Sequence, residues 1–338
     1  MFQNYQLNRC YIIAEIGGNF TTIDDAILLI DEAANCGVDA VKLQTYKAET
    51  LSSGHAIFDM ENTGVTSQFD LFRKYEIDID MHRTIFKYAQ TRGLDWFSSP
   101  SHKMDVELLE SCGVGAYKIG SDDAVNLPFL RFVASIGKPI ILSTGMCTLD
   151  EVKESVKEIL AAGCPNLMLL HAITNYPTHP ENVNLAAMQT LMETFQSLAV
   201  GYSDHTLTPV ASLCAVAMGA RIIERHFTWD KTAQGPDHML SADPAEMKWL
   251  VEAIRQFEVM RGSGIKEPAL SEATTRRNNR KSVVLQRAML AGQVIELKDI
   301  SVKRPGYGIP PKYLEQLVGR TVTRDMEQDS VITWDDLA

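Results

Sequence analysis

The sequence lacks several features that would each define a class of protein. No apolar run approaches the roughly 20 residues that a membrane-spanning helix needs. The first ten residues, MFQNYQLNRC, have no basic start followed by an apolar core, so we expect no signal peptide. Basic residues are outnumbered, with 32 Lys and Arg against 43 Asp and Glu, and the net charge is −11. This balance argues against binding of nucleic acid or of an anionic membrane surface, although a local cluster of Lys and Arg can still bind a small anion.

Cysteine pairs and glycine-rich phosphate loops are also missing. None of the six cysteines forms a CxxC pair, and most lie in or beside apolar runs. We therefore predict buried, reduced thiols in a cytoplasmic protein. The cysteines are Cys10, Cys36, Cys112, Cys147, Cys164 and Cys214.

Short apolar runs alternate with longer helical segments through the first 265 residues. Runs this short that are apolar on both faces are typical of strands in a covered parallel sheet. The eight predicted strands are residues 11–16, 40–45, 94–99, 116–121, 139–144, 167–172, 198–203 and 221–227. The predicted helices include residues 24–35, 80–90, 148–162, 209–218 and 244–260.

Eight strand–helix units over about 250 residues are typical of a (β/α)8 barrel, which is the α/β fold that we predict for residues 1–265. The alternative is a doubly wound open sheet, which usually has a glycine-rich phosphate loop after its first strand. Neither GxGxxG nor GxxxxGK[ST] occurs in the chain. The connection at residues 46–93 is longer than an ordinary strand–helix connection, and residues 47–70 show no clear periodicity. We expect a lid or an oligomer contact there.

Polar side chains stand at the ends of the predicted strands, where a barrel gathers its chemistry. A charged side chain inside an apolar strand is costly unless it is paired or used. These residues are Glu15, Lys42, Gln44, Ser98, Ser99, Lys118, Ser121, Asp123, Ser143, Thr144, His171, Ser203, Asp204, His205, Glu224 and His226.

Two subsets of these residues suggest a site. Lys42 and Lys118, with the hydroxyls of Ser99 and Ser121, offer positive charge and hydrogen-bond donors to a phosphate or carboxylate. His205 and His226 end adjacent strands, and their imidazoles can share a divalent metal, with Glu15 across the barrel mouth. A single such Lys or His could equally be structural. No motif singles out a nucleophilic Cys, a Ser-His-Asp triad or a Schiff-base Lys.

The character of the chain changes after about residue 266. Residues 266–280 are polar and read as a linker, and residues 281–338 as a small β-rich domain of short strand-like pieces and turns. The segment RPGYGIPP at 304–311 predicts a rigid loop that presents Arg304, although a solvated surface Arg is an equal interpretation.

The chain resembles the N-acetylneuraminate (sialic acid) synthase family, including legionaminic acid synthases, over nearly its whole length. The motifs that carry the resemblance are AEIGGNF at 14–20, VKLQT at 41–45, FSSP at 97–100, YKIGS at 117–121, KPIILSTGM at 138–146, GYSDHT at 201–206, IIERHFT at 222–228, GPDH at 235–238 and RPGYGI at 304–309.

The resemblance implies a TIM barrel followed by an antifreeze-like (SAF) domain. It implies condensation of phosphoenolpyruvate with an N-acetylated mannosamine-type sugar to a nine-carbon acid, with release of phosphate. A divalent metal, manganese or magnesium, and a domain-swapped homodimer are expected with it.

The resemblance also assigns roles to residues of this chain. It places the metal on His205 and His226, and it makes Glu15 and Asp123 the catalytic carboxylates. Phosphoenolpyruvate would contact Lys42, Gln44, Ser99, Lys118, Ser121, Thr174 and Ser203. The sugar would contact Tyr176, Asp237 and Arg304, the last of these from the partner chain.

Two positions depart from the sialic acid enzymes. Asp123 stands where they carry Glu, and Thr174 stands where they carry Asn. Both changes favour a related sugar such as a 2,4-diacetamido-trideoxy hexose, as in legionaminic acid synthesis. The alternatives are another phosphoenolpyruvate-dependent synthase, which makes an eight-carbon ulosonate from a phosphorylated pentose, and a non-catalytic sugar-binding or ice-binding protein.

Overall fold

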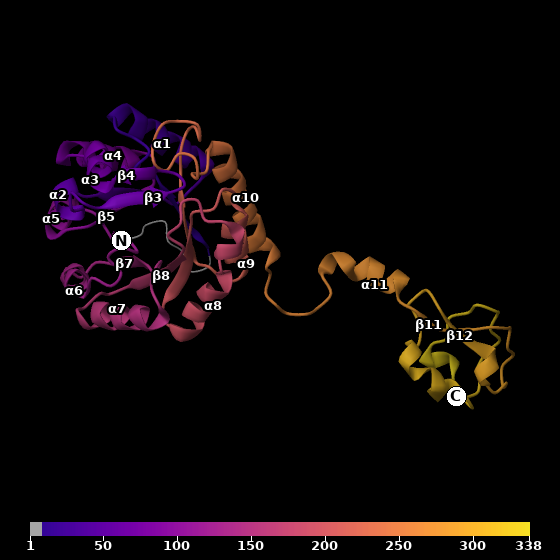
Figure 1. Cartoon of the computed structure of the whole chain (residues 1–338). Helices are drawn as coiled ribbons and strands as arrows, with labels where there is room; N and C mark the ends of the chain where they lie inside the picture. The colour runs from indigo at the N-terminus through magenta and orange to yellow at the C-terminus, as the bar shows by residue number, and fades with distance from the viewer. Residues whose placement is uncertain (1–8) are drawn as a thin grey trace. The chain divides into compact units, whose positions relative to one another are not determined.

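The computed structural model describes residues 9–338, so most of the segment on which we based the absence of a signal peptide lies outside the described residues. The chain divides into two compact units, Met1–Arg261 and Gly262–Ala338. The first is a barrel surrounded by helices, and the second is a smaller unit with few regular strands (Figure 1). The domain limits at residues 265 and 280 stay a prediction.

Eight parallel strands close into a barrel in the order β1-β10-β9-β8-β7-β6-β5-β2. The prediction of a (β/α)8 barrel is therefore confirmed. Each strand begins at the first residue of its predicted run or one residue later. The strands are β1 (Tyr11–Glu15), β2 (Ala40–Thr45), β5 (Asp95–Pro100), β6 (Tyr117–Ile119), β7 (Ile140–Ser143), β8 (Leu167–Ala172), β9 (Ala199–Asp204) and β10 (Ile222–His226).

Helices follow the strands and form the outer layer (Figure 1). Local signals set their ends: Thr148 and Glu151 form a capping box, and Gly37 ends the first helix with φ of 83°, a conformation that favours glycine. The helices of this layer are α1 (Ile23–Cys36), α4 (Ile79–Thr91), α5 (Lys103–Cys112), α6 (Leu127–Ser135), α7 (Leu149–Ala161), α8 (Leu185–Thr194), preceded by the 3-10 turn η1 (Pro180–Asn182), α9 (Val210–Ala217) and α10 (Pro244–Met260).

Successive side chains along each strand point to opposite sides, so the strands contribute to two separate apolar cores. On β1, Ile12 and Ala14 pack with the helix layer, whereas Tyr11 and Ile13 join an apolar cluster that fills the barrel interior. The next residue with the inward direction is Glu15. The interior therefore changes from apolar to polar toward the carboxyl ends of the strands.

The connection after β2 contains structure that the sequence did not show. It holds α2 (Ala48–Leu51), a hairpin of β3 (Ile57–Met60) and β4 (Gly64–Ser67), and α3 (Gln68–Tyr75). At the hairpin turn, the Asn62 amide donates to the carbonyl of Tyr176 over 3.2 Å, and its Nδ2 donates to the carbonyl of Pro236 over 2.7 Å. The hairpin is thus attached to the loops after β8 and β10. A lid or oligomer role stays a prediction.

The second unit has its own core, which includes Val283, Leu285, Ile300 and Ile332. A two-stranded antiparallel sheet, β11 (Ser282–Leu285) with β12 (Ile300–Lys303), is its regular β-structure among the described residues. Other predicted strand pieces form single bridges, such as Val294 with Thr321. The unit also contains η2 (Leu270–Glu272), α11 (Ala273–Asn279), η3 (Leu297–Asp299), η4 (Pro311–Leu317) and η5 (Trp334–Asp336). Helix α11 lies within the predicted linker.

The expectation of buried cysteines is right for only part of the set. Cys10, Cys36 and Cys164 are buried, Cys112 and Cys147 are half-buried, and Cys214 is exposed, all six as free thiols. Cys214 lies on α9, whose buried residues are Ser212, Ala215 and Val216, so it falls on the outer face of that helix. Within residues 9–338, no helix has the length and apolar character needed to cross a bilayer.

Candidate functional site

Four charged side chains meet inside the barrel near the carboxyl ends of the strands. Lys42 on β2 forms an ion pair with Glu15 on β1, and its Nζ lies 3.7 Å from Oε1 of Glu224 on β10. Lys118 on β6 places its Nζ 3.4 Å from the same Glu224 oxygen. All four side chains are at most 5% exposed. Both lysines are thus confirmed as buried at the strand ends, where each has carboxylate partners.

Burial and pairing shift the protonation of these groups. Burial raises the pKa of Glu15 to about 7, although Lys42 opposes the shift. Burial would also raise the pKa of Glu224, but Lys118 and Lys42 outweigh it and lower that pKa. Burial lowers the pKa of Lys118 despite Glu224, whereas two carboxylates reverse the effect of burial on Lys42 and raise its pKa. Glu15 therefore titrates near neutral pH, the range in which a general acid or base is most effective.

Two hydroxyl groups contact the four charged side chains, and a third follows β6. Ser99 Oγ on β5 accepts a hydrogen bond of 3.3 Å from Lys42, and Ser203 Oγ on β9 donates to Glu224 over 3.1 Å. The backbone amide of Gly145 donates to Ser121 Oγ over 3.0 Å.

A methyl group at Gly145 would lie 2.4 Å from Thr174 Oγ1 and 2.8 Å from Ser121 Oγ. Thr174 and Ser121 therefore approach the same point, which only a glycine leaves open. Gln44 follows Lys42 by two residues on β2 and pairs with Ser99 in the strand register.

The two predicted metal-binding histidines face each other. Their ring centroids are 5.5 Å apart, and the Tyr176 ring lies 4.3 Å from His205 and 5.9 Å from His226. His205 Nδ1 donates to the carbonyl of Ile173 over 2.7 Å, which leaves Nε2 with its lone pair free. His226 Nδ1 is buried without a hydrogen-bond partner among the described residues and lies 3.5 Å from Asp237 Oδ2.

These donors fit a divalent metal ion. Burial lowers the pKa of His205, and burial with repulsion from His205 brings the pKa of His226 well below its usual value. Both imidazoles are then neutral at pH 7, as a ligand must be. Burial, assisted by Glu15, raises the pKa of the neighbouring Asp237 to about 7. Among residues 9–338, no group of three or more His, Cys, Asp or Glu is set to hold a metal alone. An ion held by the His pair would need further ligands from substrate or water.

Asp123 has a different environment from the other predicted site residues. Its Oδ1 accepts a hydrogen bond of 2.8 Å from Asn126, the residue that caps α6. Burial raises the pKa of Asp123 to about 6, with Asp122 and Asp105 as the neighbouring charges. Burial raises the pKa of Tyr176, and the charges of Asp237, Glu224 and the exposed Asp122 add to that rise. The catalytic role of Asp123 stays a prediction.

Arg304 lies in the second unit, in the loop after β12. Its assignment to the sugar stays a prediction. Glu224 is among the polar strand-end residues that the sequence singles out but has no role in the predicted site, and in the structure it contacts both lysines and Ser203. Its position two residues before His226 on β10 gives it the same inward direction, and that spacing is the signal that could have identified it.

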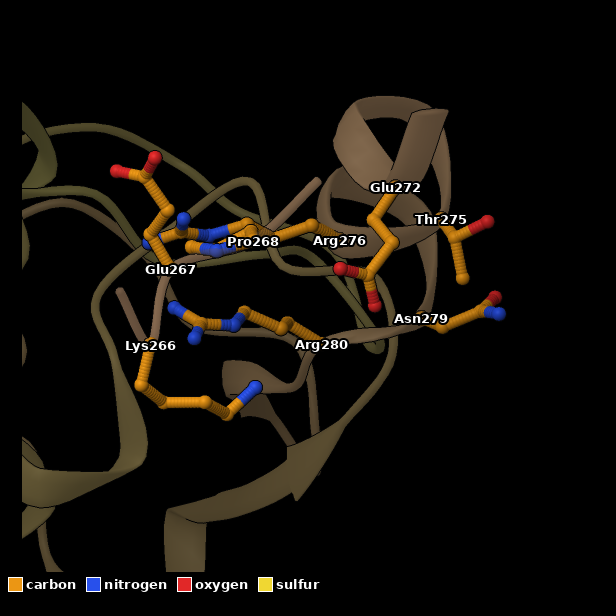
Figure 2. Close-up of a pocket in the computed structure, with 8 residues that line it drawn as sticks. All are labelled: Lys266, Glu267, Pro268, Glu272, Thr275, Arg276, Asn279 and Arg280. Carbon is orange, nitrogen blue, oxygen red and sulfur yellow. The ribbon is translucent and has the colours of Figure 1, made fainter. Parts of the chain in front are cut away.

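The second unit also has a hollow of its own, with a volume of about 490 Å³. Figure 2 shows the side chains of Arg276, on α11, and of Arg280, which directly follows that helix, extending toward the segment Lys266–Pro268. All its lining residues are exposed, and none belongs to the predicted site. The barrel mouth therefore remains the candidate site.

Comparison with known proteins finds a match for each of the two units. The model of the NeuB family matches residues 29–266, and that of the SAF domain matches residues 280–338. The N,N'-diacetyllegionaminic acid synthase of Legionella pneumophila is 39% identical over 96% of this chain and 94% of its own length. The synthase of that name from Campylobacter jejuni is 37% identical over 96% and 99%.

A solved structure is similar in both sequence and fold. The N-acetylneuraminic acid (sialic acid) synthetase of Leptospira borgpetersenii, in complex with citrate, superposes with a TM-score of 0.71 at 32% identity. The match covers 79% of this chain and 90% of that chain.

We predict that Asp123 makes stability depend on pH. A carboxyl whose pKa is higher in the folded protein stabilises it at low pH, and this stabilisation is lost as pH rises from about 4 to about 6. The Asp123→Asn variant has no carboxyl at this position, so it does not lose this stabilisation as pH rises. The free energy of unfolding of the variant minus that of the unsubstituted protein should therefore be larger, which means greater relative stability, at about pH 8 than at about pH 4. Urea unfolding at both values measures the difference, and an equal difference at the two would contradict the assignment.

Proposed function

The chain belongs to the NeuB family, and on that premise we propose that it condenses phosphoenolpyruvate with an acetamido sugar to a nine-carbon nonulosonic acid and releases phosphate. The observation that carries the proposal is the combination of groups at the barrel mouth. Two buried lysines with hydroxyl donors adjoin a carboxylate that titrates near pH 7, and a pair of neutral histidines lies at the same end of the barrel.

Phosphoenolpyruvate carries a phosphate and a carboxylate, and both require cations and donors. Lys42 and Lys118 supply the charge, and Ser99, Ser121 and Ser203 supply hydroxyls. Gln44 and Thr174 complete the proposed contacts. Because Glu15 and Glu224 now neutralise the lysines, an entering anion must compete with them. Protonation of Glu15, with its pKa of about 7, would lower that competition.

We assign the metal, manganese or magnesium, to His205 and His226. When bound, such an ion supplies a Lewis acid that polarises the carbonyl of the sugar aldehyde. The chain itself fixes the two imidazoles: His205 through its bond to the Ile173 carbonyl, and His226 through its place at the end of β10. Asp237 and Tyr176 border the same space and are proposed to contact the sugar.

In the proposed reaction, carbon 3 of phosphoenolpyruvate attacks the aldehyde carbon and forms the new carbon–carbon bond. Water adds at carbon 2, and cleavage of the bond between carbon 2 and the phosphate oxygen releases phosphate and leaves a keto group. The water must lose both of its protons, of which the aldehyde oxygen gains one and the departing phosphate gains the other. Glu15 is the proposed proton carrier because its carboxyl is buried beside Lys42 and titrates near neutral pH. Asp123 is the second candidate.

Arg304 is proposed to reach the sugar from a partner copy of the chain, as a domain-swapped homodimer would allow. A guanidinium offers a charge-assisted donor to an amide oxygen of the sugar. The 2,4-diacetamido-trideoxy hexose of legionaminic acid synthesis is the sugar that we favour. The two relatives named for that product share 39% and 37% identity with this chain, against 32% for the sialic acid synthetase. Thr174, a shorter side chain than Asn, supports the same choice.

A phosphate-release assay tests the function. Purified protein with phosphoenolpyruvate and Mn²⁺ should release phosphate with the diacetamido hexose, more slowly with N-acetylmannosamine, and not with a phosphorylated pentose. Turnover with the pentose would support an eight-carbon ulosonate synthase instead. If none of the sugars releases phosphate, the protein is not the proposed synthase, and sugar binding without turnover would then indicate a non-catalytic role.

We predict that His226→Ala abolishes Mn²⁺-dependent turnover while the protein still folds. Loss of an outer partner of a metal ligand costs roughly 10–100-fold, so loss of a ligand itself should exceed about 100-fold. The exposed His55→Ala serves as the matched control and should keep full activity. Phosphate release and the urea midpoint of both variants provide the measurement. Full activity of the unsubstituted protein after chelation would refute the metal site.

We predict that Arg304→Ala raises the Michaelis constant of the sugar by roughly 10-fold or more, because a charged hydrogen bond contributes about 1.5–3 kcal/mol. The constant for phosphoenolpyruvate should change little. Lys303→Ala removes the neighbouring cation, which pairs with Asp329, and is the control. Equal effects of Arg304→Ala on both substrates would count against contact with the sugar.

A further inference from the structure

A buried ion pair lies directly behind the two histidines. Asp204 on β9 and Arg225 on β10 are register partners, and each immediately precedes one histidine, His205 or His226. Their side chains point away from the barrel interior. Tyr202 and Ile223, which share their directions on the two strands, pack in the core between the strands and the helices. The pair therefore does not face the proposed substrate space.

The contacts of this pair converge on the chain beside His205. Arg225 Nη1 lies 2.7 Å from Asp204 Oδ2, and both side chains are fully buried. The Thr206 amide donates to Asp204 Oδ1 over 2.8 Å, and Arg225 Nη2 donates to the Thr206 carbonyl over 2.8 Å. Both backbone polar groups of the residue after His205 are thus held, one by each member of the pair.

The pair also anchors the strand ends to the helix layer. Ser212 Oγ on α9 donates to Asp204 Oδ2 over 2.5 Å. On β10, His226 Nδ1 has no hydrogen-bond partner among the described residues, so no hydrogen bond at this atom orients the ring. The position of that ring follows from the backbone that also bears Arg225.

Stability alone does not account for charges at this place. A buried ion pair is often matched or exceeded in stability by apolar residues of similar volume. What apolar residues cannot supply is directional bonds to both the N–H and the C=O of one peptide segment. The charged pair fixes where β9 ends relative to β10, and with it the separation of the two imidazoles.

We infer that Asp204 and Arg225 are positioning residues that set the geometry of the His205–His226 pair for a divalent metal. Neither side chain touches the metal or a substrate in this arrangement. The inference rests on the proposed function in one respect, which is that the two histidines hold the metal.

Mn²⁺ binding, followed by electron paramagnetic resonance of the free ion, tests the inference on the full chain. Arg225→Met leaves Asp204 as an unpaired buried charge, so this variant alone could simply fail to fold. The double variant Asp204→Asn with Arg225→Met removes both charges and should keep the folded state, as urea unfolding will show. We expect its Mn²⁺ affinity to fall by roughly 10–100-fold, the range seen when groups that orient metal ligands are removed.

The matched control is the ion pair of Asp39 and Arg255, joined over 2.9 Å. Asp39 immediately precedes β2 and accepts from the Ile12 amide, so it lies at the amino end of the barrel. Asp39→Asn with Arg255→Met should lower the urea midpoint and leave Mn²⁺ affinity unchanged.

The outcomes separate the two claims. If the unsubstituted protein does not bind Mn²⁺, the metal part of the proposed function fails. If it binds Mn²⁺ and the folded Asp204/Arg225 double variant binds equally well, the positioning inference is overturned while the metal site stands. Equal losses of affinity in both double variants would also overturn it, because the effect would then be general to barrel stability.

Discussion

Burial of four charges at one end of the barrel is the constraint on which the site depends. Lys42, Lys118, Glu15 and Glu224 are withdrawn from water together, and each is tolerated because an opposite charge adjoins it. The protonation state of each of these four side chains therefore depends on the charges of the other three. Two cations lower the pKa of Glu224, whereas burial raises the pKa of Glu15, which adjoins a single lysine, to about 7.

The barrel makes this arrangement possible by combining alternation with closure. Alternate residues of all eight strands face one interior. When the inward residues change from apolar to polar along the strands, the barrel interior therefore changes from an apolar layer to a polar layer toward its mouth. Tyr11 and Ile13 lie in the apolar layer, and Glu15 lies above them on the same strand. The Asp204–Arg225 pair is buried on the helix side of β9 and β10, so the proposed positioning residues lie on the opposite face of these strands from the residues of the proposed site.

The sequence was sufficient to predict elements that depend on local patterns, but not contacts between residues that are far apart along the chain. Continuous apolar runs predicted all eight strands, and their ends located Lys42, Lys118 and the histidines. The hairpin of β3 and β4 escaped because its four-residue strands have no buried face, and its turn is held by the loops at Tyr176 and Pro236, more than a hundred residues away. The hydrogen bond between Asp123 and Asn126 depends on the turn after β6, which residue types alone do not specify.

The attachment of Asn62 has a mechanical consequence for the mouth of the barrel. Through two hydrogen bonds, one residue joins the connection after β2 to the loops after β8 and β10, the same loops that carry Tyr176 and Asp237. Three segments that come from different parts of the chain are thereby linked into one rim. They cannot swing outward separately without breaking these bonds. The arrangement of the rim at this place thus depends on the backbone amide and the side-chain amide of a single residue.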